Sequence, residues 1–224
     1  MSGLRERKKE RTRRAISEAA IALFLEHGFD PVSVADVAAA AEVSKPTLFS
    51  YFSTKEDLVV HRFADHQDQA AGVVRGRAAG ETVLAALHRD FLDGLARRDP
   101  ITGLNDDPRV LAFSDLVYST PSLKARGAEY LARAEQSLAR ALHEAPDLAP
   151  PRLLTAPLLA AQVTATQRVL AEHNWHRIRD DGRTADELRF EAATNADRAF
   201  ELLTAGYEGA AGHPGPTGPT DTAG

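Results

Sequence analysis

The sequence of 224 residues contains no cysteine. This absence excludes disulfides, thiol nucleophiles and cysteine-based zinc sites, and it is typical of a reducing compartment. The sequence also lacks any run of about 18 apolar residues, and its charged N-terminus lacks the apolar core of a signal peptide. Neither membrane insertion nor secretion is indicated, and we expect a cytoplasmic protein.

Motifs of several enzyme classes are missing as well. The sequence has no Gly-rich phosphate loop and no Gly-x-Ser-x-Gly elbow. A di-iron helical bundle, the main enzyme alternative, requires repeated Glu-x-x-His motifs, and none of the eight histidines has a glutamate three residues before it. His173 and His176 could share a metal, but histidines near a helix end are more often surface residues. We expect no enzyme, no metal and no other cofactor.

Sustained period-two alternation of β-branched residues, the pattern of a β-strand, is absent too. Alanine and leucine instead recur at helical spacing along most of the chain. With 43% hydrophobic and 26% charged residues, the composition is that of a globular protein with a real core. We therefore predict an all-α fold of about nine helices. The longer helices are expected over residues 5–27, 55–77, 81–98, 107–119, 121–145, 152–178 and 184–207.

Short helices are predicted after Gly28, because three capping signals follow one another closely. These signals are Ser33 with Asp36, Ser44, and Thr54 with Asp57. Helices over 34–41 and 45–52, joined by a tight turn, make a helix-turn-helix. Pro46 is tolerated because it lies in a first turn, where its missing N–H has no intrahelical partner.

The second of these helices concentrates polar and aromatic groups in the stretch EVSKPTLFSYFSTKEDL, residues 42–58. Leu48 and Phe52 lie four residues apart and are expected to face the core. The outer face would then carry Lys45, Pro46, Thr47, Phe49, Ser50 and Tyr51. A helix that enters the major groove by its N-terminal end can bond guanine through lysine and pack on thymine methyl groups. Aromatic rings that merely fill a small core would leave the other groups unexplained.

Phosphate contacts are expected around this helix. Ser50 and Tyr51 can reach the DNA backbone, and Lys55 opens the following helix, where free N–H groups favour an anion. Residues 1–14 carry seven Lys and Arg against two Glu, or 7 − 2 = +5, while the whole chain carries −5. This basic segment is either a solvated helix start or a phosphate-binding arm.

Residues 12–58 resemble the DNA-binding domain of the tetracycline-repressor (TetR) family of bacterial regulators, above all in the block KPTLFSYF followed by Lys55. The resemblance implies base or methyl contacts from Lys45, Pro46 and Thr47, and mixed contacts from Phe49. It implies phosphate contacts from Ser33, Ser50, Tyr51 and Lys55. The chain departs from the family pattern at three positions, which are Glu42 where glycine is common, Phe49 where tyrosine is frequent, and the short Ala35.

Family membership also implies a C-terminal body that binds a small-molecule inducer and dimerises through its last two long helices. Aromatic and histidine side chains that could line the pocket are His66, His88, Phe91, Phe113, Tyr118 and Trp175. A lone aromatic at helical spacing is, however, more often a core residue. Apolar positions on residues 152–178 and 184–207 are compatible with a dimeric four-helix seam or with an internal core.

The resulting organisation has three parts. Residues 1–58 form a basic arm and a DNA-binding head, residues 59–208 form the body, and the Gly- and Pro-rich residues 209–224 form a disordered tail. We predict a homodimeric regulator, most simply a repressor, that binds a palindromic operator in double-stranded DNA and is released by an inducer. A DNA-binding dimer without a small ligand and an all-α bundle enzyme are the alternatives.

Overall fold

The computed structural model describes residues 2–148 and 150–211. Within them it shows helices and turns only, which confirms the predicted all-α class. The predicted disordered tail lies outside the described residues from 212 onward, and residues 209–211 belong to the last helix. No helix in the described ranges is long and apolar enough to cross a membrane.

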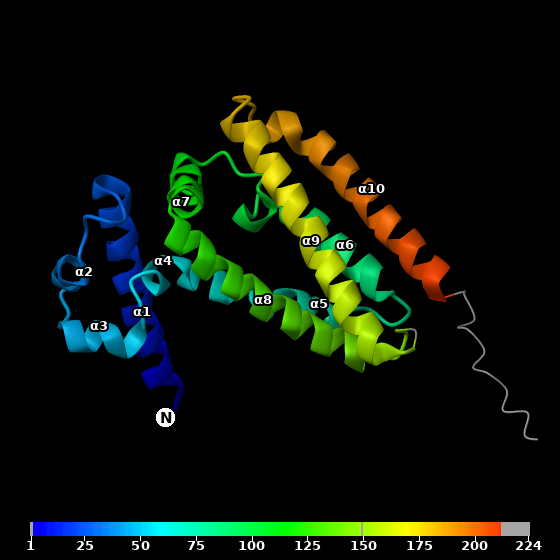
Figure 1. Cartoon of the computed structure of the whole chain (residues 1–224), viewed down its shortest axis with the longest axis horizontal. Helices are drawn as coiled ribbons and strands as arrows, with labels where there is room; N and C mark the ends of the chain where they lie inside the picture. Colours follow the sequence, from blue (N-terminus) through cyan, green and yellow to red (C-terminus); the bar gives the residue numbers. More distant parts are fainter. Residues whose placement is uncertain (1, 149, 212–224) are drawn as a thin grey trace, which may run out of the picture. The chain divides into compact units, whose positions relative to one another are not determined.

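Ten α-helices and two 3-10 helices follow one another in the described part of the chain (Figure 1). They are α1 (Ser2–His27), α2 (Val34–Ala40), α3 (Lys45–Tyr51), α4 (Asp57–Val60), η1 (His61–His66), α5 (Gln69–Gly76), α6 (Val83–Ala96), η2 (Pro100–Thr102), α7 (Pro108–Ser119), α8 (Pro121–Glu144), α9 (Arg152–Arg179) and α10 (Ala185–Ala211).

These helices divide between two compact units. The first unit comprises Met1–Gln69 and Asp106–Ala134, so that α7 and the first part of α8 share a unit with the helix-turn-helix. Its core joins Ile16, Phe24, Leu48, Phe52 and Leu58, all of which are almost completely buried. The predicted domain boundary after residue 58 therefore does not coincide with the limits of the compact units, and it stays a prediction.

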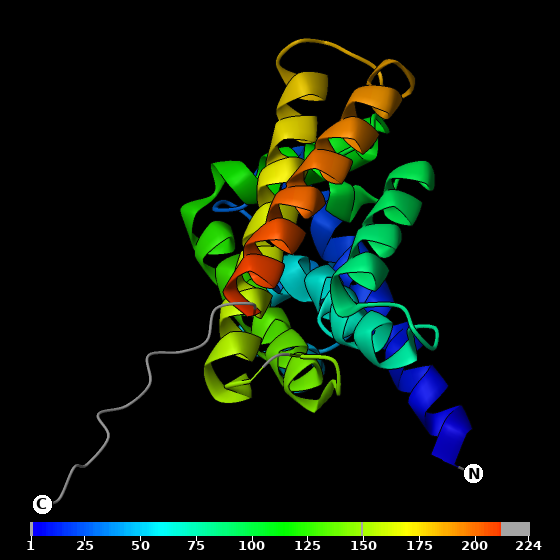
Figure 2. The same ribbon diagram turned by 90° about the vertical axis from the view of Figure 1, so that its right-hand side faces the viewer.

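The second unit contains α6, α9 and α10, and α9 and α10 run side by side (Figures 1 and 2). The short helix η2 packs closely on α9, because a Cβ atom at Gly103 would lie 1.9 Å from the carbonyl oxygen of Ala171. Gly103 has φ +70° and ends η2 in the left-handed region. The amide of Asn174 also donates to the carbonyl of Thr102 at 2.9 Å.

The single helix predicted over 55–77 is wrong. The structure breaks this segment into α4, η1 and α5, with a turn at residues 67 and 68. All four residues of α4 are buried, so the segment lacks the one-sided apolar stripe of a long amphipathic helix. The chain then tightens into a 3-10 helix.

Candidate nucleic-acid interface

Helix α1 ends at a glycine, as predicted, and this end of the helix determines where α2 begins. Gly28 has φ +87°, and its N–H donates to the carbonyl of Phe24 at 2.9 Å. Five residues later Ser33 caps α2 through a complete capping box with Asp36. The hydrogen bonds from Ser33 lower the pKa of the Asp36 carboxyl, because they favour its charged form.

The turn between α2 and α3 has a left-handed residue at its centre. Glu42 has φ +54°, the conformation for which glycine is the default. The N–H of Val43 donates to Ala38, and the N–H of Glu42 donates to Ala39, which is the hydrogen-bond pattern of a Schellman motif. The departure from the family pattern at Glu42 therefore places a non-glycine residue in the left-handed region, at the corner of the helix-turn-helix.

Helix α3 has the two faces that the sequence predicts. Leu48 and Phe52 are each 1% exposed and belong to the core, whereas Phe49 is 51% exposed. Lys45, Pro46, Thr47 and Ser50 are exposed as well. Ser44 caps the helix by accepting from the N–H of Thr47 at 3.1 Å. The exposed face of α3 thus combines one aromatic ring with polar groups.

Several predicted contact groups have partners within the chain. The Thr47 hydroxyl lies 2.7 Å from the Ser44 hydroxyl, and the Ser50 hydroxyl donates to the carbonyl of Thr47 at 2.6 Å. The Ser33 hydroxyl donates to Asp36 at 2.7 Å. Tyr51, expected on the outer face, is half-buried and packs against the core, because it lies at the last turn of α3.

Lys55 does not extend freely into solvent. Its ammonium donates to the carbonyl of Phe29 at 2.5 Å and to that of Asp30 at 3.3 Å. The same nitrogen lies 4.3 Å from the ring centroid of Phe29 and 5.5 Å from that of Phe24. Lys55 thus links the segment after α3 to the segment before α2, and two of its three N–H donors are used there.

Two long-range contacts of the head escape sequence reasoning. The buried Ser17 hydroxyl donates to the carbonyl of Leu58 at 2.7 Å and ties α1 to α4. The Asp57 carboxylate, predicted only as part of a helix cap, accepts from the guanidinium of Arg126, 69 residues away. Neither pair has a local sequence signal, because the spacing between the partners follows from the tertiary fold alone.

The six side chains predicted to line a ligand pocket are divided between the two compact units. His66, Phe113 and Tyr118 belong to the first unit, and His88, Phe91 and Trp175 belong to the second. Within the first unit His66 accepts or donates a hydrogen bond with Gln69 at 2.8 Å, Phe113 packs against Phe63, and Tyr118 is 45% exposed. Phe91 is a core residue that packs near Phe200, and Trp175 contacts the ring of His176.

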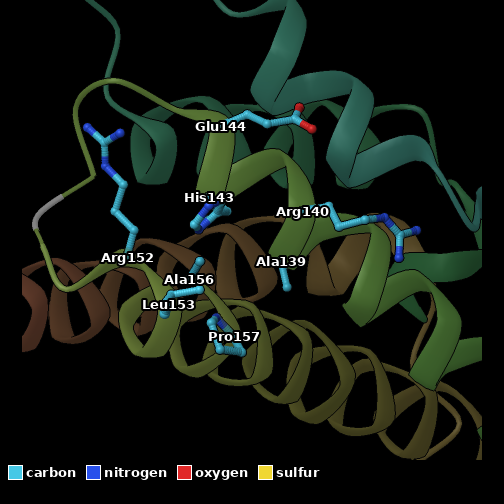
Figure 3. Close-up of a pocket in the computed structure, with 8 residues that line it drawn as sticks. All are labelled: Ala139, Arg140, His143, Glu144, Arg152, Leu153, Ala156 and Pro157. Atoms are coloured by element: carbon cyan, nitrogen blue, oxygen red, sulfur yellow. The ribbon is translucent and has the colours of Figure 1, made fainter.

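The second unit has shallow pockets that are open to solvent, and two of them are lined by predicted or titratable side chains. One, of about 270 Å³, is lined by residues that include Arg140, His143, Leu153 and Ala156. Figure 3 shows the His143 ring directed toward Leu153 and Ala156, with the guanidinium of Arg140 directed away. The other, of about 380 Å³, is lined by His88, whose ring stacks on Phe200 and whose Nε2 lies 2.9 Å from Asp197. Of the six predicted pocket residues, His88 lines one of these two pockets and the others line neither.

His173 and His176, which could have shared a metal ion, each lie beside a carboxylate instead. His173 lies 3.6 Å from Glu191, and His176 lies 2.7 Å from Asp180. The hydrogen bond from His176 is the main cause that lowers the pKa of Asp180. Among the described residues, no group of three or more His, Asp or Glu side chains is arranged to hold a metal ion.

A helix-turn-helix whose second helix is capped and exposed is the architecture of many DNA-binding regulators. Residues 16–61 match the bacterial regulatory proteins of the tetR family. The chain is 33% identical over 205 residues to the HTH-type transcriptional regulator TcmR of Streptomyces glaucescens, a match that covers 88% of this chain and 87% of TcmR. The chain belongs to the TetR family of DNA-binding transcriptional regulators, which are not enzymes.

Solved structures share the fold at low sequence identity. Native NalD, the secondary repressor of the MexAB-OprM multidrug efflux pump in Pseudomonas aeruginosa, has a TM-score of 0.55 and 20% identity, covering 88% of this chain and 97% of that one. FadR of Bacillus subtilis in complex with stearoyl-CoA has a TM-score of 0.51 and 18% identity, covering 86% and 98%. The likeness confirms an all-α fold with an N-terminal helix-turn-helix.

Proposed function

We propose that this regulator is a homodimeric repressor that binds a palindromic operator through α3 and is released by a small-molecule inducer. The observation that carries the proposal is the division of α3 into a buried face and an exposed face. Phe49 is half-exposed while Leu48 and Phe52 are buried, so the exposed side chains serve a partner rather than the core. For a regulator of transcription, that partner is double-stranded DNA.

The exposed face of α3 supplies the proposed base contacts. Lys45, Pro46 and Thr47 occupy the first turn, which enters the major groove in helix-turn-helix proteins. Phe49 would pack on thymine methyl groups or on the sugars beside them. Phosphate contacts are assigned to Ser33, Ser50, Tyr51 and Lys55. The hydroxyls of Ser33 and Ser50 would exchange their present partners for phosphate oxygens by rotation, and Lys55 would use its third N–H.

The basic arm is proposed to add phosphate contacts. Residues 2–27 form one continuous helix, so the arm is an extension of α1 rather than a loose tail. Lys8, Lys9, Arg11 and Arg14 are exposed on this extension. Clustered cations release counterions from DNA and strengthen binding to every sequence alike.

Dimerisation through α9 and α10 is proposed from the apolar side chains that these helices leave uncovered. Leu154, Leu158 and Val169 on α9 are 60%, 53% and 55% exposed, and Phe190 on α10 is 72% exposed. On α9 these residues repeat at roughly helical spacing along one stripe. A second copy of the chain would cover them, and two heads would then face two half-sites.

Sedimentation equilibrium tests this interface. Leu158→Glu places a charge in the proposed dimer interface and is expected to yield a monomer at micromolar concentration. Lys124→Glu, at an exposed position on α8, serves as the control. An unchanged dimer in Leu158→Glu would contradict the assignment of α9.

The inducer and the operator require separate experiments. Selection of DNA duplexes from a random pool should enrich a palindrome whose half-sites are about one helical turn apart. Release of that duplex by a small molecule would distinguish an inducible repressor from a DNA-binding dimer without a ligand. Since FadR of Bacillus subtilis binds stearoyl-CoA, acyl-CoA thioesters are one reasonable first set of compounds. Failure to enrich any sequence would count against the proposed function itself.

A further inference from the structure

Helix α4 contains a buried carboxylate. All four residues of this one-turn helix are buried, and Asp57 is 6% exposed. The N–H of Asp57 donates to the Thr54 hydroxyl at 3.2 Å, which ties the start of α4 to the segment that follows α3. A buried charge is costly unless it is paired and hydrogen-bonded, so the partner of Asp57 decides how α4 is held.

That partner is Arg126 on α8, within the same compact unit. Its Nε donates to Oδ1 of Asp57 at 2.8 Å and its Nη2 donates to Oδ2 at 3.2 Å, so the contact is bidentate. The remaining Nη1 contacts Glu129, and the Tyr130 hydroxyl lies 3.5 Å from Oδ1 of Asp57. We call Asp57, Arg126, Glu129 and Tyr130 the α4–α8 clamp.

The titration behaviour of the α4–α8 clamp agrees with this geometry. Burial alone would raise the pKa of Asp57, but the hydrogen bonds and the charge of Arg126, with the hydrogen bonds of Thr54, outweigh it and lower that pKa. Burial raises the pKa of Tyr130, and the negative Asp57 raises it further. Near neutral pH the carboxylate is therefore charged and the phenol is protonated.

The geometry of the α4–α8 clamp fixes how α4 is oriented relative to α8. A buried ion pair often contributes no more stability than apolar residues of the same volume, but a fork of two hydrogen bonds fixes one orientation. Helix α4 is also held by the Ser17 hydroxyl, which donates to the carbonyl of Leu58 at 2.7 Å. Immediately after α4 the chain forms the 3-10 helix η1, so the clamp acts where the chain changes its helical geometry.

We propose that Arg126 is a positioning residue for DNA binding: acting through Asp57, it holds α4, and with it the recognition helix α3, in the orientation that contacts DNA. Four residues, Ser53 to Glu56, separate α4 from the C-cap of α3, so a shift of α4 is transmitted to α3 over a short distance. The proposal rests on the proposed function, because it presumes that α3 contacts the operator.

The test uses full-length Arg126→Met, which keeps much of the stem and removes the charge. The matched control is Arg75→Met, which breaks the exposed pair with Glu144 at 3.1 Å in the second unit. Affinity and its salt dependence are measured with the duplex that the wild-type protein enriches from a random pool, at a temperature where circular dichroism shows every variant folded. If the wild type enriches no duplex, the proposed function fails before the clamp is tested.

We expect Arg126→Met to bind the duplex about tenfold more weakly. The salt slope, which is the slope of the logarithm of the binding constant against the logarithm of the salt concentration, should be unchanged, since every phosphate contact is kept. Arg126→Lys, which retains the charge but not the fork, should recover part of the affinity, and Arg75→Met should stay within about twofold of the wild type. Wild-type affinity in folded Arg126→Met would overturn the proposal and leave the pair a purely structural contact. A salt slope lowered by about 0.9 per head would also overturn it, because Arg126 would then bind phosphate itself.

A second variant keeps the test decisive if Arg126→Met does not fold. Asp57→Asn removes the buried charge, so Arg126 is no longer needed as a counter-charge. We expect Asp57→Asn to weaken DNA binding, and the double variant Asp57→Asn/Arg126→Met to be no weaker than Asp57→Asn alone. Losses that add in the double variant would show that the two residues act separately, and the proposal would be wrong.

Discussion

Lys55 is expected to stabilise the folded head as well as to contact DNA. The structure supports the stabilising role because the ammonium donates to the carbonyls of Phe29 and Asp30 and lies 4.3 Å from the ring centroid of Phe29. Hydrogen bonds to charged groups contribute about 1.5–3 kcal/mol each when well formed, and a cation over a ring adds about 0.5–1 kcal/mol. Since Lys55 is half-buried and one of its two bonds is long, we expect Lys55→Met to lower the free energy of unfolding by about 2–3 kcal/mol.

The assay is thermal unfolding without DNA, followed by circular dichroism. For a chain of this length, about 2–3 kcal/mol corresponds to a fall in Tm of roughly 4–12 °C. Lys45→Met is the matched control, because Lys45 is exposed on α3, and its Tm should change by no more than about 2 °C. A wild-type Tm for Lys55→Met would refute the reasoning, since the two carbonyl contacts would then contribute nothing to the folded head.

Three further predictions concern the arm, the recognition helix and acid stability. Deleting residues 2–11 should weaken binding to all DNA sequences alike and reduce the salt slope by roughly 0.9 for each phosphate that the arm neutralises, whereas an unchanged slope would assign the arm to solvation alone. Phe49→Ala should leave the Tm within about 2 °C of wild type yet weaken operator binding, because the ring is half-exposed and outside the core, and a large fall in Tm would contradict this. The lowered pKa of Asp57 means that its stabilising contribution is complete above the unfolded-state pKa of about 4 and is lost as the pH falls through the lower folded value. In urea titrations from about pH 5 to pH 2, Asp57→Asn should therefore lose less stability than the wild type, and equal losses would show that the carboxylate is not stabilised in the fold.

The head was predictable because its signals are local. The capping residues Ser33 and Ser44, the stop at Gly28 and the four-residue spacing of Leu48 and Phe52 each act within one or two helical turns. Even the strained Glu42 could be predicted, since the turn requires a left-handed residue whatever its side chain.

The features that the sequence did not predict depend on contacts between residues that are far apart in the sequence. The break of the segment 55–77 into three helices follows from the complete burial of α4, which no periodicity reveals. The Asp57–Arg126 pair and the carbonyl partners of Lys55 join residues 69 and about 25 positions apart. The assignment of the pocket residues stays a prediction for a related reason: an aromatic at helical spacing has the same sequence pattern whether it lies in a core, as Phe91 does, or lines a pocket.

The central claim, that α3 reads DNA sequence by its N-terminal turn, is tested most directly at Thr47. The measurement is the affinity of the wild type and of Thr47→Ala for the enriched operator and for every single-base variant of one half-site, at two salt concentrations. We expect Thr47→Ala to cost about 1–3 kcal/mol on the operator, to relax the preference at one base pair per half-site and to leave the salt slope unchanged. An equal loss of affinity on every variant, with all base preferences kept, would contradict the assignment of α3 as the helix that reads the bases.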